Sequence, residues 1–214
     1  SAHLTRDLGM CCGGTMEAFI EPLTVMADLV IYGAGHVGRA TARLASGLDF
    51  RVQLIDDRAD QLALIEPSPG ISLREASPLR VLETLPFHAD AYHLILTHSH
   101  QLDQDLLEQL IERDLAWLGM IGSRAKLSKF FLRLRAGGID PELFKRVSSP
   151  VGLDIGAETP EEIACSIAGE LIRVRRRSPR PTLPMSELPL SARGGDGRAL
   201  APALTNLDSE PEEG

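Results

Sequence analysis

Apolar residues along the chain form two kinds of pattern. Short continuous apolar runs are typical of buried strands, whereas apolar residues at every third or fourth position are typical of helices with one buried face. The runs predict strands at 28–32, 50–55, 92–97 and 115–121, and the helical spacing predicts helices at 36–48, 59–66, 102–113, 124–135 and 159–173. Prolines and a glycine between 67 and 78 predict loops there.

Strands that alternate with helices predict a parallel sheet with helices on both faces. We therefore expect a doubly wound, mostly parallel α/β domain of the Rossmann-like class over residues 28–176, preceded by an N-terminal segment at 1–27. Residues 177–214 are rich in Pro, Gly, Ser and acidic residues and have no apolar periodicity, so we expect them to form a disordered tail.

The overall charge and composition narrow the classes of partner. The 214 residues carry a net charge of −8, which argues against a nucleic-acid partner because such proteins need a basic face. We expect neither membrane association nor a signal peptide, since no apolar run approaches the ~20 residues of a membrane span and residues 1–14 have no basic segment followed by an apolar stretch. Three cysteines, two of them adjacent, do not suggest a disulfide framework and favour a reducing, cytoplasmic setting.

A G-x-G-x-x-G motif follows the first predicted strand and opens the first predicted helix. Gly33 permits a tight turn, Gly35 lets the backbone approach a pyrophosphate, and Gly38 lets helix and strand pack closely. We expect His36 to lie beside the ligand. Asp56 ends the second strand, where it would accept a hydrogen bond from a ribose 2′-OH and favour NAD-like ligands over NADP. The alternative is a sheet that keeps these glycines for packing alone.

A second anion site is possible where a later strand turns into a helix. Gly122, Ser123 and Arg124 stand at this turn, and Arg124 with Lys126 would hold a phosphate. In a parallel sheet this loop lies on the same edge as the glycine motif, so the two loops would face one crevice. The alternative is an ordinary turn in which Ser123 caps the helix.

Two histidines follow the strand predicted at 92–97. We expect His98 and His100 to line the same crevice, because strand ends carry the sites of this fold. The alternative is a simple helix start. We expect no metal site, since the zinc pattern that this H-x-H resembles needs an aspartate where Leu102 stands.

Adjacent cysteines near the start of the chain are the most unusual chemical feature. Cys11 and Cys12 precede two glycines, and a thiolate there would bind a soft metal or carry sulfur as a persulfide. The alternative is that one or both are small buried apolar residues. Cys165 lies among apolar residues of a predicted helix, so we expect it to pack in the core.

Together these segments resemble the xanthine dehydrogenase accessory (XdhC/CoxI) family. The resemblance extends in consistent order over about residues 9–173. The matching segments are CCGGTMEAFIEPL at 11–23, VIYGAGHVGRA at 30–40, LIDDR at 54–58, THSHQLD at 97–103, GMIGSRAK at 119–126 and SPVGLDIGAETPEEIACSIAGEL at 149–171.

The resemblance implies a cytoplasmic chaperone of molybdenum hydroxylases rather than a catalyst. Such proteins bind molybdenum cofactor (molybdopterin), protect it while a cysteine desulfurase supplies a terminal sulfur, and deliver it to the apo-enzyme. By resemblance, Cys11 or Cys12 would contact the cofactor or relay sulfur, and the glycine loop would hold its pterin phosphate or nucleotide part. We also expect a homodimer. One departure is that family members usually carry an upstream domain with a further cysteine motif, and we expect no such domain within residues 1–27.

Two other functions fit the glycine loop. An NAD(H)-dependent oxidoreductase would use the loop and Asp56, but it needs a substrate domain and an acid/base group, and few residues remain outside the predicted sheet. A nucleotide-sensing Rossmann module would need neither cysteine. The cysteine pair and the ordered set of motifs favour the maturation factor.

Overall fold

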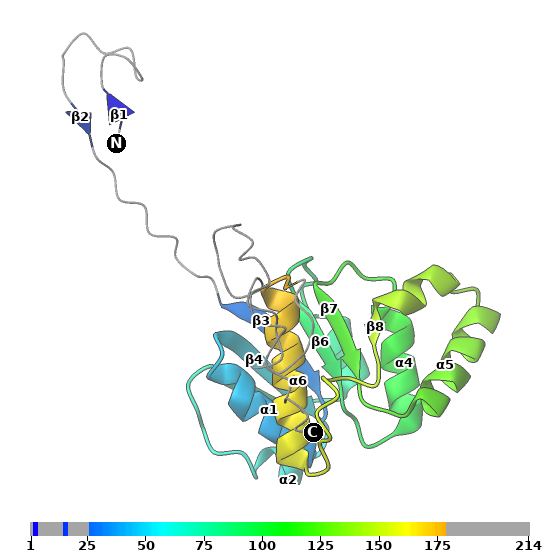
Figure 1. Ribbon diagram of the computed structural model, residues 1–214. Helices are drawn as coiled ribbons and strands as arrows, with labels where there is room; N and C mark the ends of the chain where they lie inside the picture. Colours follow the sequence, from blue (N-terminus) through cyan, green and yellow to red (C-terminus); the bar gives the residue numbers. More distant parts are fainter. Residues whose placement is uncertain (1, 4–14, 17–25, 179–214) are drawn as a thin grey trace, which may run out of the picture.

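The computed structural model describes residues 2–3, 15–16 and 26–178. Its main feature is a six-stranded, fully parallel sheet with the strand order β5-β4-β3-β6-β7-β8 (Figure 1). The strands are β3 (Ala27–Tyr32), β4 (Phe50–Asp56), β5 (Ile71–Glu75), β6 (Tyr92–Ile95), β7 (Trp117–Met120) and β8 (Val147–Ser148). Counted from β3, this is the order 3-2-1-4-5-6 of Rossmann folds, which confirms the predicted fold class. A separate antiparallel pair joins β1 (Ala2–His3) to β2 (Thr15–Met16).

Helices cover both faces of the sheet (Figure 1). On one face, α1 (His36–Ser46) packs against α6 (Pro160–Arg175). On the other lie α3 (Pro78–Leu82), α4 (His100–Leu110) and α5 (Arg124–Ala136). Two short helical turns complete the domain: α2 (Ala59–Leu62) after β4 and η1 (Pro141–Arg146) before β8.

Alternation along the central strand creates two hydrophobic cores. Leu29 and Ile31 of β3 point into the core under α1 and α6, whereas Val30 and Tyr32 point into the core under α3, α4 and α5. Leu29, Ile31 and Tyr32 have no exposed surface. Burial on both faces explains why this strand reads as a continuous apolar run in the sequence.

Three expectations about the elements were wrong. The segment predicted as loops contains β5 and the start of α3, and β8 was not predicted at all. Both strands lie at sheet edges. All residues of β5 are half-buried or exposed and β8 has only two residues, so neither carries a long apolar run. Cys165 is exposed on α6 rather than packed in the core. Most of the predicted tail lies outside the described residues.

A histidine lies buried in the core beneath α3 and α4. His93 is 1% exposed, its Nδ1 lies 2.9 Å from the hydroxyl oxygen of Tyr32, and its ring stacks between Tyr32 and Phe87 at centroid distances of 5.8 and 5.7 Å. Its Nε2 is buried and has no hydrogen-bond partner within residues 26–178. Burial, together with the nearby positive charge of His88, lowers the pKa of His93 to about 4.

This buried histidine makes stability depend on pH. The unfolded chain takes up a proton near pH 6.5 and the folded chain only near pH 4, so stability is lost as the pH falls through that window. We expect the free energy of unfolding to drop by roughly 2 kcal/mol between pH 7 and pH 5 from this group alone. The double variant Tyr32→Phe/His93→Phe removes both polar partners together and should flatten that decline in urea unfolding. An equal decline in both proteins would contradict this assignment.

Candidate functional site

The carboxyl edge of the sheet carries the loops that were predicted to bind a ligand. Strand order reverses direction between β3 and β6, and ligands of this fold bind at such a switch point. The glycine loop follows β3 and the 97–100 turn follows β6, so the structure brings these two predicted segments together. A side chain at Gly33, whose φ is +116°, would overlap the carbonyl group of Leu96 at the end of β6.

The three motif glycines have different surroundings. A side chain at Gly38 would overlap the carbonyl oxygen of Gly33, so this glycine allows α1 to pack on the loop. A Cβ at Gly35 would meet no atom within 4 Å, so its surroundings are open. Gly35 is also the N-cap of α1 and provides no side-chain hydrogen bond, and the first turn contains no acidic residue. The backbone there remains available to an anion, as a phosphate site requires.

A buried carboxylate fixes the turn that carries His98 and His100. Asp103 is 1% exposed and accepts hydrogen bonds from the backbone nitrogen and hydroxyl of Thr97 at 3.1 and 2.6 Å. Ser99 caps α4 by accepting from the backbone of Leu102. Both histidines are exposed, as is His36 at the start of α1. Within the described residues no group of three or more His, Cys, Asp or Glu side chains is suited to a metal ion.

Asp56 is placed at the end of β4 as expected, but its oxygens face the protein. It is 2% exposed, accepts from the backbone nitrogen of Ala34 at 2.7 Å, and receives three hydrogen bonds from Arg58 between 2.8 and 3.0 Å. Burial raises the pKa of Asp56, but these hydrogen bonds outweigh it and lower the pKa to about 2. The carboxylate therefore holds the glycine loop to β4. A contact between Asp56 and a ribose stays a prediction. Such a contact would have to share these oxygens with Ala34 and Arg58.

The second predicted loop carries two cationic side chains, of which only Lys126 forms an ion pair within residues 26–178. Ser123 caps α5 by accepting from the backbone of Lys126 at 3.2 Å, and Gly122 has a φ of +155°. The ammonium of Lys126 lies 2.6 Å from Asp103, so this charge is already paired. Arg124 is exposed and lines a cavity of about 410 Å³ at the same edge. Cys11 and Cys12 lie outside the described residues.

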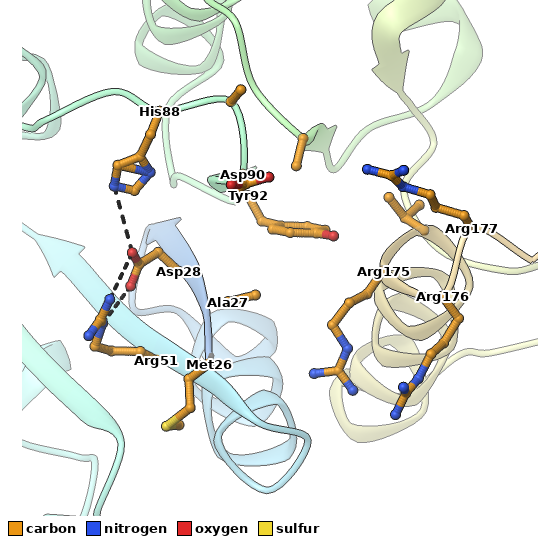
Figure 2. A pocket seen from close by; sticks show the side chains of 13 residues that line it. Met26, Ala27, Asp28, Arg51, His88, Asp90, Tyr92, Arg175, Arg176 and Arg177 are labelled. Carbon is orange, nitrogen blue, oxygen red and sulfur yellow. Dashed lines mark hydrogen bonds and ion pairs between the residues drawn. The ribbon is translucent and has the colours of Figure 1, made fainter. Parts of the chain in front are cut away.

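A larger hollow than the one beside Arg124 lies at the opposite edge and was not anticipated. It measures about 730 Å³ and is lined by the amino ends of β3, β4 and β6 and by the end of α6 (Figure 2). Arg51 binds Asp28 through two hydrogen bonds of 2.5 and 2.9 Å, and His88 lies 3.7 Å from the same carboxylate. Arg175–Arg177 lie across the hollow from this group (Figure 2). The run of arginines at 175–177 is the sequence signal that could have indicated it.

Comparison with known proteins agrees with this architecture. The XdhC Rossmann domain family matches residues 29–171, which include the glycine loop, both histidines and the cavity beside Arg124. The chain belongs to this family. The match confirms the resemblance inferred from the sequence.

Individual relatives and one solved structure also match the chain. The chain is 36% identical over 204 residues to the uncharacterized protein YqeB of Escherichia coli (strain K12), and 32% identical over 163 residues to a probable xanthine dehydrogenase subunit of Bacillus subtilis (strain 168). These alignments cover 92% and 76% of the chain but only 37% and 47% of the relatives. A crystal structure of a xanthine dehydrogenase from Bacillus halodurans superposes with a TM-score of 0.62 and 30% identity, over 71% of this chain and 45% of that one. The chain thus spans less than half the length of these relatives.

No helix among residues 26–178 is long and apolar enough to cross a membrane. The six-stranded sheet with its two helical layers is the part of the chain that matches the XdhC Rossmann domain.

The glycine loop yields a prediction that separates packing from binding. Gly33→Ala should lower the free energy of unfolding by about 2–4 kcal/mol because it combines a positive φ with a backbone overlap, and Gly38→Ala should lower it by about 1–3 kcal/mol. Gly35→Ala should change it by less than about 1 kcal/mol, since the added methyl group enters open space. Urea unfolding followed by circular dichroism measures all three. Equal losses would show that the loop glycines serve packing alone.

Asp56 yields a second prediction. Its folded-state pKa of about 2 lies below the usual 3.8, so its contribution is complete above about pH 5 and is lost as the pH falls toward 2. We expect Asp56→Asn to be less stable than the unmodified protein by roughly 2 kcal/mol at pH 7, and this difference to shrink between pH 5 and pH 2. Asp57→Asn, at the exposed neighbour, should cost less than about 0.5 kcal/mol throughout. A pH-independent deficit in Asp56→Asn would refute the ionised contact.

Proposed function

We propose that this XdhC-family chain binds molybdenum cofactor at the carboxyl edge of its sheet. In this role it assists sulfuration of the cofactor and its insertion into a molybdenum hydroxylase. The observation that supports the proposal most directly is the open backbone at Gly35, inside a domain whose named relatives are linked to xanthine dehydrogenase. Because the chain spans less than half of those relatives, the complete maturation activity is part of the proposal.

The residues of the crevice suit the phosphate-bearing part of such a cofactor. At Gly35 the backbone is free of side chains, and the N-terminus of α1 has neither a side-chain cap nor an acid in its first turn. Backbone N–H groups and the positive end of the helix dipole favour a phosphate there. His36, His98 and His100 are exposed on the elements that border the crevice and supply further hydrogen-bond donors.

Sulfur handling would fall to the cysteine pair. A thiolate at Cys11 or Cys12 would take the terminal sulfur of a desulfurase persulfide, leave the desulfurase thiolate behind, and hold the sulfur as a new persulfide. The partners in this scheme are a cysteine desulfurase and the apo-hydroxylase. A homodimer remains our expectation for the assembly.

Anaerobic binding of purified molybdenum cofactor tests the proposal. We expect Gly35→Val to weaken binding by at least about tenfold, a loss of ~1.4 kcal/mol, because the added side chain occupies the phosphate approach. The matched control is Gly47→Val at the other end of α1, where a side chain meets only an ordinary contact with Leu44. Titration calorimetry or cofactor fluorescence would report affinity, with NAD as a competitor.

The cysteines are tested separately, by activation of an apo-hydroxylase as well as by cofactor binding. The double variant Cys11→Ser/Cys12→Ser should reduce activation of a molybdenum hydroxylase while the sheet domain keeps its stability. If the unmodified protein binds NAD and no molybdenum cofactor, and the double variant behaves identically, the maturation role is wrong and a nucleotide-binding role takes its place.

A further inference from the structure

A cavity lies at the carboxyl edge of the sheet, beside the loops that follow β7 and β8. It measures about 410 Å³ and is enclosed by the start of α5, the segment 150–157 and the first turns of α6. This volume is in the range of small-molecule sites. The loops that form it follow β7 and β8, whereas the glycine loop follows β3, so the two places lie on different halves of one sheet edge.

Arg124 opposes the local electrostatics of the helix that it begins. It occupies the first position of α5, directly after the N-cap Ser123, where the helix dipole disfavours a positive charge. The first turn contains no acidic residue to compensate, and within residues 26–178 no hydrogen bond or ion pair reaches its guanidinium. The arginine is therefore not placed there for the stability of α5. A guanidinium in a cavity suits an anionic ligand group.

The lining of the cavity also includes an exposed apolar side chain. Ile155 is 55% exposed, and the neighbouring lining residues Val151, Leu153 and Ile163 are also apolar. An exposed isoleucine on a cavity wall offers a contact surface for an apolar ring face.

The segment that carries Ile155 is firmly attached to α6. The hydroxyl of Ser166 donates to the carbonyl of Leu153 at 2.5 Å, and the backbone nitrogen of Leu153 donates to the carbonyl of Ser166 at 3.2 Å. The buried carboxylate of Glu170 accepts from the backbone nitrogen of Gly152 at 2.5 Å, from the indole of Trp117 at 3.3 Å and from the hydroxyl of Ser148. The cavity wall is thus preformed before any ligand binds.

We propose that this cavity holds the ring-bearing half of the ligand whose phosphate lies at the glycine loop. The ligand class is a planar heterocycle that carries its own oxygen acceptors and N–H donors, apart from the phosphate. The apolar side chain of Ile155 packs against the ring, Arg124 donates to an oxygen on the ring or its substituent, and the exposed carboxylate of Asp154 accepts from its N–H groups. The inference rests on the proposed function, in which the ring is the pterin of molybdenum cofactor; in a dinucleotide it is the nicotinamide.

Three probes separate the two halves of the ligand: molybdenum cofactor, NAD and ADP-ribose, which lacks the nicotinamide ring. The test variants are Arg124→Gln and Ile155→Ala, both at exposed positions where the fold loses little. The matched controls are Arg135→Gln, an exposed arginine at the far end of α5, and Ile172→Ala, an exposed isoleucine near the end of α6. Gly35→Val tests the binding of the phosphate-bearing half of the ligand.

We expect each test variant to weaken binding of the ring-bearing ligand about 10- to 100-fold while ADP-ribose binding and both controls are unchanged. Gly35→Val should weaken every ligand that binds. If only NAD responds to the cavity variants and molybdenum cofactor does not bind, the ring site stands and the proposed function fails. If Gly35→Val weakens cofactor binding and the cavity variants do not, the proposed function stands and this inference is overturned. If none of the three ligands binds the unmodified protein, both fail.

Discussion

The geometry of the carboxyl edge depends on the absence of side chains at Gly33 and Gly38. Gly33 lies against the carbonyl of Leu96, and Gly38 lies against the carbonyl of Gly33, so β3, β6 and α1 meet at one point of backbone contact. A methyl group at Gly33 would have to push the loop away from the end of β6, and one at Gly38 would have to push α1 away from the loop. The open position of Gly35 and the placement of the 97–100 turn both follow from this close approach.

Asp56 reinforces the same contact from the neighbouring strand. Its carboxylate joins the end of β4 to the backbone of Ala34 inside the loop, while Arg58 closes the other side. An acid at this position is usually interpreted as a ribose acceptor. In this protein the carboxylate of Asp56 stabilises the loop, so a ribose contact would have to share the same two oxygens. Binding data on variants of Asp56 therefore need the stability measurement beside them.

Local signals explain which parts of this architecture the sequence could predict. The glycine loop and β3 were predictable, because the motif demands a turn and a strand buried on both faces has no polar interruptions. The edge strands β5 and β8 were not, because they are stabilised by hydrogen bonds to β4 and β7 rather than by apolar residues of their own. Cys165 has apolar sequence neighbours, yet the helix phase turns it to the exposed side of α6. The cavity beside Arg124 depends on contacts between distant segments, which no local pattern records.

Cavity size alone would favour the edge of the sheet opposite to the proposed site. In the larger hollow, Asp28 is neutralised by Arg51, and Arg175 donates to the carbonyl of Leu48 while stacking on Phe50 at 4.8 Å from the ring centroid. These groups have intramolecular partners that account for their presence. Arg124 and Ile155 do not: one opposes a helix dipole and the other exposes an apolar side chain to solvent. Both residues line one cavity at the edge where Rossmann domains bind ligands, and the fold requires neither of them. Such residues are better evidence of function than the volume of a cavity.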